Sequence, residues 1–315
     1  MIRYTLLLLS SCFFLSDSWS QVPEKPYENS HFLMVDSVFI HFRTWNDDLA
    51  APRGNVLLIH GFCGSTFCWR NNYDTLVKAR YRIIAIDLPG FGYSERSATL
   101  NQSQSYRARL IWDLLTKIDG TDTVKWNVIG HSMGGGTAEA VALMQPKRIQ
   151  SLIIVAGMVF INNNNVNGVI SNLVNTEFYK KLLLSYTENK YLTFDHFRKQ
   201  LKGTYGYMPD TNVVNGYLKP LLIEGSAETV VNLIANSKEI QPLHAEDLDQ
   251  LPVMVVWGEK DRTIPERAGK KLKKAVPRIE LRTIPYARHM VMETHAELFN
   301  SLMVEFLNRN NGPAR

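Results

Sequence analysis

The sequence predicts a doubly wound α/β protein with a mostly parallel, eight-stranded sheet and a helical insertion. Three observations predict it: short continuous apolar runs recur along the chain, helical segments lie between them, and one interval of about 90 residues contains no such run. Runs that are apolar throughout are typical of strands buried on both faces of a parallel sheet. Strands that alternate with helices in this way imply right-handed crossover connections.

Each predicted element follows from a local pattern. The continuous apolar runs, which we interpret as core strands, occupy residues 55–61, 81–87, 126–130, 152–155, 253–257 and 279–284. Residues 35–45 alternate apolar and polar side chains, which is the pattern of an edge hairpin. Helical segments between the strands are predicted at residues 106–117, 136–144 and 265–275.

The interval without strands, residues 160–249, is interpreted as a helical insertion between two parts of one core, residues 21–159 and 250–315. A chain of 315 residues with 45% hydrophobic composition suits one large domain of this kind. The insertion has amphipathic stretches at 172–184 and 194–201 and is rich in Tyr, Phe and Leu. We expect it to form a cap, whose apolar underside favours an acyl chain or aromatic group over a highly charged substrate.

Residues 1–20 have the pattern of a secretory signal peptide, with Arg3 before the apolar stretch 6–15 and a small residue at Ser20. The apolar stretch is too short to span a bilayer as a helix. We therefore expect a secreted or periplasmic protein, cleaved after Ser20. Because Leu9-Ser10-Ser11-Cys12 resembles a bacterial lipobox, a form anchored by lipid through Cys12 is the alternative.

The bulk charge does not indicate a nucleic-acid partner. The formal net charge is +5, and part of it lies in Lys270-Lys271-Leu272-Lys273-Lys274. No aromatic side chains are interleaved with these lysines, so we interpret the segment as the solvated face of a surface helix. The expected partner is a small-molecule substrate.

Beyond the first 20 residues the chain contains two cysteines, Cys63 and Cys68. In an oxidising compartment they either close a small disulfide loop or remain free thiols. Neither has the neighbouring ligands of a metal site, and no Gly-rich phosphate loop is present, so we expect neither a metal nor another cofactor.

The segment Gly130-His131-Ser132-Met133-Gly134 joins a predicted strand to a predicted helix. A serine hydroxyl keeps its proton at pH 7 and becomes nucleophilic when a nearby histidine accepts that proton. A tight turn between glycines lifts the serine clear of the backbone, and the helix after it directs free N–H groups at the same place. Ser132 is therefore the candidate nucleophile.

Five motifs together resemble those of the α/β-hydrolases, over residues 55–307. In chain order they are His60-Gly61-Phe62, Asp87-Leu88-Pro89-Gly90-Phe91-Gly92-Tyr93-Ser94, the Ser132 segment, Trp257-Gly258-Glu259-Lys260-Asp261-Arg262-Thr263-Ile264-Pro265, and Ala287-Arg288-His289-Met290. Each follows a predicted strand, and ligands of open α/β sheets bind beyond the carboxyl ends of the strands. The resemblance implies a serine hydrolase of the esterase or lipase type with a helical cap.

The resemblance also implies the partners of Ser132. His289 follows the last predicted strand and is the candidate base; as in family members, an apolar pair follows it and Glu293 lies four residues on. Asp261 is the candidate acid that orients the imidazole of His289. The nearest competitors are His295, which would lie in the next helix, and Glu259, which is less favoured by its position.

The remaining motif residues receive supporting roles. The backbone N–H groups of Phe62 and Met133 are the candidate oxyanion hole. We interpret His60 and His131 as structural residues of the motif turns, and Asp87 as the residue that closes the turn at Pro89-Gly90.

A serine at this position argues against haloalkane dehalogenases and epoxide hydrolases, which have aspartate there. The expected activity is hydrolysis of a carboxylic ester through an acyl-enzyme. The alternatives are a C–C hydrolase of meta-cleavage products, a cofactor-free perhydrolase, or a non-hydrolytic small-molecule receptor. The C–C hydrolases usually have Asn and Trp where this chain has His131 and Met290. Arg288 replaces a glycine found in most relatives, and either binds an anionic group of the substrate or faces solvent.

Overall fold

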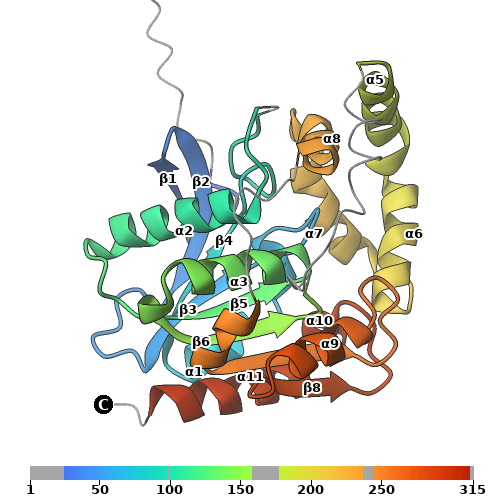
Figure 1. The fold of residues 1–315 in the computed structure, drawn as a ribbon. Helices are drawn as coiled ribbons and strands as arrows, with labels where there is room; N and C mark the ends of the chain where they lie inside the picture. The colour runs from blue at the N-terminus through green and yellow to red at the C-terminus, as the bar shows by residue number, and fades with distance from the viewer. Residues whose placement is uncertain (1–24, 98, 158–176, 237–244, 313–315) are drawn as a thin grey trace, which may run out of the picture.

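The computed structural model describes residues 25–97, 99–157, 177–236 and 245–312. An eight-stranded sheet runs through the molecule and carries helices on both faces (Figure 1). The strands are β1 (Ser30–Val35), β2 (Val38–Trp45), β3 (Gly54–Ile59), β4 (Tyr81–Ile86), β5 (Trp126–His131), β6 (Ile149–Val155), β7 (Val253–Gly258) and β8 (Glu280–Ile284). This sheet confirms the predicted fold class. The predicted signal peptide and Cys12 lie outside the described residues.

The sheet order is β1-β2-β4-β3-β5-β6-β7-β8, and every pairing from β4 to β8 is parallel. All residues of β5 and β7 are buried, as expected for apolar strands that are covered by helices on both faces. β8 lies at the edge of the sheet and is only partly buried. The candidate residues Ser132, Asp261 and His289 follow β5, β7 and β8, and the first two of these strands are buried along their whole length.

The edge hairpin differs from the prediction in its span. The alternating residues 35–45 do not fold back on themselves; β2 takes up most of them and pairs with the upstream strand β1. The turn consists of Asp36 and Ser37, which have φ of 46° and 65°. Two residues with positive φ are typical of the tight turns whose twist suits a hairpin. The prediction was wrong here because residues 30–34 show little alternation of their own.

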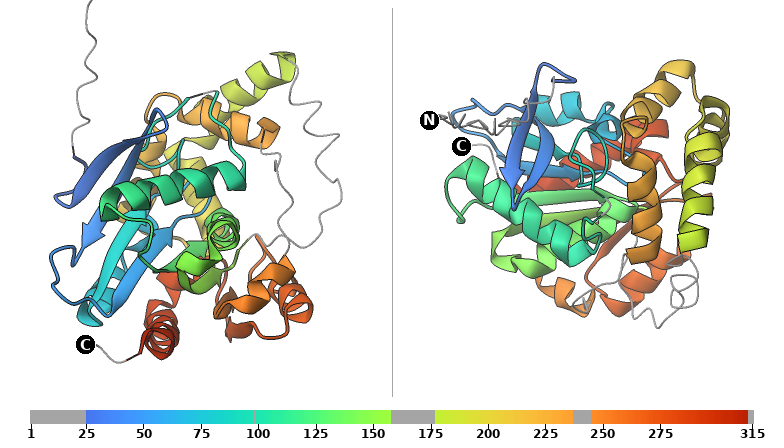
Figure 2. Two further views of the ribbon diagram at one scale, coloured as in Figure 1. Left: turned by 60° about the vertical axis from the view of Figure 1, so that its left-hand side comes forward. Right: turned by 90° about the horizontal axis from the view of Figure 1, so that it is seen from above.

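Helices of the core pack on the sheet in two groups (Figures 1 and 2). Helices α2 and α3 pack against each other on one face, with α9 beside β7 and β8, while α1 and α11 lie together on the other face. Their bounds are α1 (Tyr73–Lys78), α2 (Gln104–Asp119), α3 (Met133–Met144), α9 (Arg267–Ala275), α10 (Val291–Thr294) and α11 (Ala296–Asn311). Short helical turns are η1 (Thr66–Trp69), η2 (Pro146–Arg148) and η4 (Ala245–Gln250).

The insertion between β6 and β7 is helical wherever the structure describes it, and parts of the predicted span, 160–176 and 237–244, lie outside the described residues. Its elements are α5 (Glu177–Tyr186), η3 (Thr187–Tyr191), α6 (Phe194–Tyr205), α7 (Thr211–Leu221) and α8 (Ser226–Asn236). These helices lie at the end of the sheet toward which the arrowheads of β6 and β8 point (Figure 1). The sequence indicated α5 and α6 but not α7 or α8, because a glycine and a proline interrupt the apolar pattern of α7.

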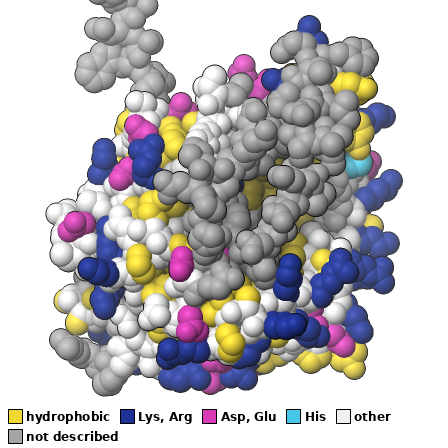
Figure 3. Space-filling model, in the orientation of Figure 1, with side chains coloured by type: hydrophobic (Ala, Val, Ile, Leu, Met, Phe, Trp, Pro, Cys, Tyr) yellow, Lys and Arg dark blue, Asp and Glu magenta, His cyan; other side chains and the backbone are white. Residues whose placement is uncertain are grey.

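The lysine-rich segment lies on α9, where Lys270 pairs with Glu266 and Lys271 and Lys274 are exposed to solvent. On the face shown in Figure 3, Lys and Arg side chains are dispersed along the lower and right-hand edges among acidic and uncharged groups. The pairing and exposure of the α9 lysines agree with a solvated helix face. Within the part of the chain that the structure describes, no helix is both long enough and apolar enough to cross a bilayer.

Candidate active site

Ser132 lies in the sharp turn between β5 and α3. Its backbone has φ 54° and ψ −121°, which is a strained conformation for a residue with a side chain. A Cβ at Gly130 would lie 2.1 Å from the carbonyl oxygen of Gly134, so the strand and helix approach this closely only with glycine there. The sequence therefore fixes a turn that holds the Ser132 side chain away from its own backbone.

The structure brings Ser132, His289 and Asp261 together from three loops. The Ser132 Oγ lies 2.9 Å from the His289 Nε2, and the His289 Nδ1 lies 2.8 Å from the Asp261 Oδ2. Because a carboxylate only accepts hydrogen bonds, Nδ1 carries a proton in this pairing. In the neutral imidazole Nε2 is then the acceptor that faces the hydroxyl.

Asp261 is held by backbone groups as well as by the imidazole. It is buried in the turn after β7, and its Oδ1 accepts hydrogen bonds from the N–H groups of Thr263 (2.8 Å) and Ile264 (3.0 Å). The other oxygen is left for His289. With one oxygen fixed by two donors, the carboxylate presents the other at one angle, which orients the imidazole ring.

The two competitors do not join this arrangement. Glu259 is exposed, pairs with Lys260 and accepts a hydrogen bond from the N–H of Tyr286. His295 lies at the N-terminus of α11, with its Nδ1 2.9 Å from the hydroxyl of Thr294.

The two candidate oxyanion donors, Phe62 and Met133, belong to two segments near Ser132. Met133 is the first residue of α3, so its N–H belongs to the first turn, which has no helical acceptor. Phe62 follows β3 and lines the same pocket as Ser132, with its ring edge-on to Phe91 at 5.8 Å between centroids.

A pocket of about 190 Å³ opens over Ser132 between the core and the cap. The cap contributes Tyr191, Phe197, Gln200, Leu201, Thr204 and Tyr217 to the lining of the pocket. The core supplies Gly61, Phe62, Cys63, Gly64, Cys68, His131, Ser132, Thr263, His289 and Met290. None of these lining residues, taken from the described part of the chain, is a lysine, an arginine or a carboxylate.

His131, the residue before Ser132, supports the loop that contains His289. The Nε2 of His131 lies 3.2 Å from the backbone carbonyl of His289 and donates to it, because a carbonyl only accepts. Burial, and then the nearby His289, lower the pKa of His131 well below its ordinary value. His131 is therefore a neutral donor, a contact that no sequence pattern indicated.

His60 has a similar supporting role in the loop of the candidate oxyanion hole. Its Nδ1 lies 2.7 Å from the carbonyl of Gly61, and its Nε2 accepts a hydrogen bond from the N–H of Leu88. Burial lowers the pKa of His60. The imidazole thus fixes the backbone just before Phe62.

Cys63 and Cys68 are both buried free thiols, so the structure does not contain the disulfide that was one of the two expectations. Burial raises the pKa of Cys63 to about 12, which keeps the thiol protonated. Cys63 has φ of 53° and lines the pocket beside Phe62. Among the residues that the structure describes, no group of three His, Cys, Asp or Glu side chains is arranged to hold a metal ion.

Arg288 is partly exposed to solvent and is not among the residues that line the pocket. Its guanidinium donates to the backbone carbonyl of Gly203 in the last turn of α6, at 3.1 Å. A cation at the C-terminal end of a helix is also favoured by the helix dipole. Arg288 therefore connects the loop of His289 to the cap.

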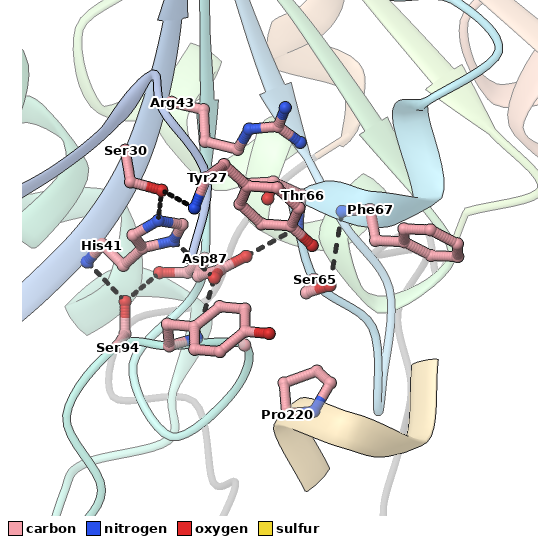
Figure 4. Close-up of polar contacts among 12 residues, drawn as sticks. Tyr27, Ser30, His41, Arg43, Ser65, Thr66, Phe67, Asp87, Ser94 and Pro220 are labelled. Carbon is pink, nitrogen blue, oxygen red and sulfur yellow. Dashed lines mark hydrogen bonds and ion pairs between the residues drawn. The ribbon is translucent and has the colours of Figure 1, made fainter. Parts of the chain in front are cut away.

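A second chain of Ser, His and Asp side chains lies in the core around Asp87 (Figure 4). The Ser30 Oγ lies 2.8 Å from the His41 Nε2, and the His41 Nδ1 lies 2.7 Å from the Asp87 Oδ2. All three residues are fully buried, and none lines the pocket. These three hydrogen-bonded side chains have the spacing of a catalytic triad, but substrate cannot reach them. Their role is structural.

The Asp87 carboxylate connects several segments of the core through its hydrogen bonds. It also accepts hydrogen bonds from the N–H groups of Thr66 (2.6 Å) and Tyr93 (2.8 Å). The bond to Tyr93 closes the turn after Pro89 and Gly90, as the sequence indicated. The bond to Thr66 fixes the start of η1, just beyond the loop that contains Phe62.

The fold and this arrangement together define the class of protein. The family model described as alpha/beta hydrolase fold matches residues 54–296, and the chain belongs to this family. It is therefore a hydrolase-family protein with a small-molecule site.

Particular relatives differ in their reactions. A 2-hydroxy-6-oxononadienedioate/2-hydroxy-6-oxononatrienedioate hydrolase of Escherichia coli O81 is 29% identical over 301 residues, covering 92% of this chain and 99% of the relative. An esterase from Exiguobacterium antarcticum has a TM-score of 0.70 at 17% identity, covering 88% of this chain and 98% of its own. A meta-cleavage product hydrolase from Pseudomonas fluorescens IP01 has a TM-score of 0.67 at 20% identity, covering 89% and 97%.

Proposed function

We propose that the protein is a serine hydrolase that cleaves uncharged carboxylic esters with a small acyl group. Ser132 Oγ attacks the ester carbonyl while His289 Nε2 takes its proton, and Asp261 holds the imidazolium that forms. The N–H groups of Phe62 and Met133 stabilise the oxyanion, each contributing about 3 kcal/mol to lowering the barrier. His289 then protonates the leaving alcohol, and water activated by His289 releases the acid from Ser132.

The observation that carries the choice of substrate is the lining of the pocket. Its described residues include no lysine or arginine, so a substrate carboxylate would lose its hydration there without gaining a cation. The E. coli relative acts, by its name, on a dioate, which has two carboxylates. A pocket of about 190 Å³ lies below the range of about 300–1,000 Å³ that holds drug-sized ligands, which favours a short acyl group.

The second candidate is cleavage of a C–C bond in a meta-cleavage product. The identity of 29% to the E. coli dioate hydrolase, over nearly the full length of both chains, favours it. His131 and Met290 weigh against it, because this reaction usually has Asn and Trp at those positions. The Ser–His–Asp arrangement serves both reactions.

Parallel assays of the two substrate classes test the proposal. p-Nitrophenyl esters from acetate to decanoate would be compared with a 2-hydroxy-6-oxo-dienoate at the same enzyme concentration. We expect the highest kcat/KM with acetate or butyrate and a decline with longer chains. Faster turnover of the dienoate than of every ester would contradict the proposal and support the second candidate.

Export of the protein is a separate proposal, which rests on the signal-peptide pattern of residues 1–20. N-terminal sequencing of the exported protein is expected to give Gln21 as the first residue. A mature protein that begins with a lipid-modified Cys12 would replace this proposal with the lipid-anchored alternative.

A further inference from the structure

A buried cluster of charged and phenolic groups lies where the cap meets the core, outside the Ser–His–Asp set. It consists of Glu293 in α10, Arg70 after η1, Tyr205 in α6 and Tyr217 in α7, and we call it the Glu293 cluster. Arg70 pairs with the carboxylate at 2.5 Å, from Nη2 to Oε2. The hydroxyls of Tyr205 and Tyr217 donate to Oε2 and Oε1. Two of the three donors therefore belong to the cap.

The Glu293 carboxylate keeps all its hydrogen-bond donors only when α6 and α7 lie against the core. The Glu293 side chain is 1% exposed, and burial raises its pKa against the opposing effects of Arg70 and the two tyrosines. A buried carboxylate that loses hydrogen-bond donors pays a large desolvation cost. Movement of α6 or α7 away from the core would remove a phenol from Glu293, so the cluster favours one position of the cap.

Contacts of the Phe67 ring also hold α7 against the core. The guanidinium of Arg70 lies over the ring of Phe67, 4.2 Å from its centroid, and the Phe67 ring packs edge-on against Tyr217 at 5.5 Å. A Cβ on Gly216 would lie 2.2 Å from the Phe67 ring. The backbone of α7 thus approaches Phe67 as closely as a glycine permits.

The cap helices that the cluster holds form the wall of the catalytic pocket. Tyr217 itself lines the pocket, as does Thr204, the residue before Tyr205. The carbonyl of Thr204 accepts the backbone N–H of His289 at 3.0 Å. The bond between Tyr205 and Glu293 therefore fixes the end of α6 that lies against the substrate space.

We propose that Glu293 is a positioning residue that seats α6 and α7 over Ser132 through Tyr205 and Tyr217, and so limits the acyl group that the pocket admits. The kinetic part of this inference rests on the proposed ester hydrolysis. It places the main effect on substrate binding, because the side-chain hydrogen bonds among Ser132, His289 and Asp261 lie within the core, and the cap reaches His289 only through its backbone N–H.

The test is the double variant Tyr205→Phe/Tyr217→Phe, which removes both hydroxyls and keeps both rings. The matched control is Tyr186→Phe, which removes an exposed cap hydroxyl. For the preferred ester we expect KM to rise about tenfold, as for loss of a hydrogen bond to a charged group, with kcat close to that of the wild type. Esters with longer acyl chains should become better substrates relative to the preferred ester. The backbone amide hydrogens of α6 and α7 should exchange with solvent deuterium faster than in the wild type. The control should match the wild type.

The rate at which a small fluorophosphonate labels Ser132 measures the reactivity of the nucleophile apart from the position of the cap. We expect this rate to be unchanged in Tyr205→Phe, because Tyr205 does not line the pocket. A folded double variant with wild-type KM and acyl-length preference would overturn the proposal, as would a fall in kcat alone. If the double variant does not fold, Tyr205→Phe is measured in the same way. If the wild type hydrolyses no ester, the proposed function fails; unchanged amide exchange in α6 and α7 then overturns this proposal, and faster exchange supports the seating role.

Discussion

The Asp261 carboxylate shows how backbone geometry selects one acid from two nearby candidates. Both Asp261 and Glu259 follow β7, and both accept backbone hydrogen bonds. Only Asp261 is buried and reaches His289, because its turn directs the side chain inward toward the loop after β8. A charged group that is buried against an imidazole acts on its tautomer, whereas an exposed carboxylate is screened by water.

We predict that Asp261→Asn lowers kcat for ester hydrolysis on the order of 10⁴-fold, because an amide in place of the carboxylate favours the wrong imidazole tautomer. Steady-state kinetics with a p-nitrophenyl ester measure the effect. Glu259→Gln is the matched control and should retain the wild-type kcat. A larger loss in Glu259→Gln than in Asp261→Asn would assign the acid to Glu259.

The candidate site residues could be predicted from the sequence because each lies in a short motif after an apolar strand. The contacts that support these residues could not be predicted in this way. His131 donates to a carbonyl 158 residues away, and Glu293 meets Tyr205 and Tyr217 across the boundary of the cap. Such partners depend on how distant elements pack, and local patterns carry no information about them.

Among the elements, the loop between β4 and α2 is organised around one buried carboxylate. Asp87 joins β2 through His41, η1 through Thr66 and its own turn through Tyr93 (Figure 4). Burial acts to raise the pKa of Asp87, but the charge and hydrogen bond of His41 and the other donors outweigh it, so the pKa lies below the ordinary 3.8. The carboxylate therefore binds its proton less readily in the folded protein than in the unfolded chain.

A lowered pKa in the folded state contributes stability that is present above the ordinary value and is lost as pH falls through the folded value. We predict that Asp87→Asn lowers the free energy of unfolding by about 3–5 kcal/mol at pH 7, since it breaks a buried pair. Between pH 5 and 3 the free energy of unfolding should also fall less in the variant than in the wild type. The difference should be on the order of the free energy that corresponds to the pKa shift of one carboxyl group. Urea unfolding at several pH values measures both effects.

The control for this experiment is Asp74→Asn, which changes an exposed carboxylate in α1. It should retain both the stability and the acid profile of the wild type. An Asp87→Asn variant with an unchanged acid profile would show that Asp87 does not titrate differently in the folded state.

The strands and helices that were predicted well are those with a simple periodic pattern. Residues 106–117 lie within α2, and residues 253–257 lie within β7. The start of the edge hairpin and helices α7 and α8 were not predicted, because their apolar faces are short or interrupted. Their conformation depends on packing: β1 pairs with β2, and α7 seats Tyr217 and Leu218 against neighbouring elements.

For the whole molecule, the proposed function depends on the contact between two parts of the chain, the core and the insertion. The core supplies the candidate nucleophile and its partners at the carboxyl ends of β5, β7 and β8, and the insertion closes a small pocket above them. Sequence patterns predicted this division and an apolar cap. The size of the pocket and the lack of cations among its described lining residues emerged only from the folded arrangement, and they favour a small, uncharged acyl group.

The proposed acyl-enzyme on Ser132 can be trapped and identified directly. The enzyme would be mixed with excess p-nitrophenyl butyrate, quenched in acid at early times, and analysed by intact and peptide mass spectrometry. We expect a butyryl adduct on the peptide that contains Ser132, formed with a burst of nitrophenol, and neither adduct nor burst in Ser132→Ala. Ester turnover at the wild-type rate in Ser132→Ala, or an adduct on another residue, would contradict the proposed acyl-enzyme on Ser132.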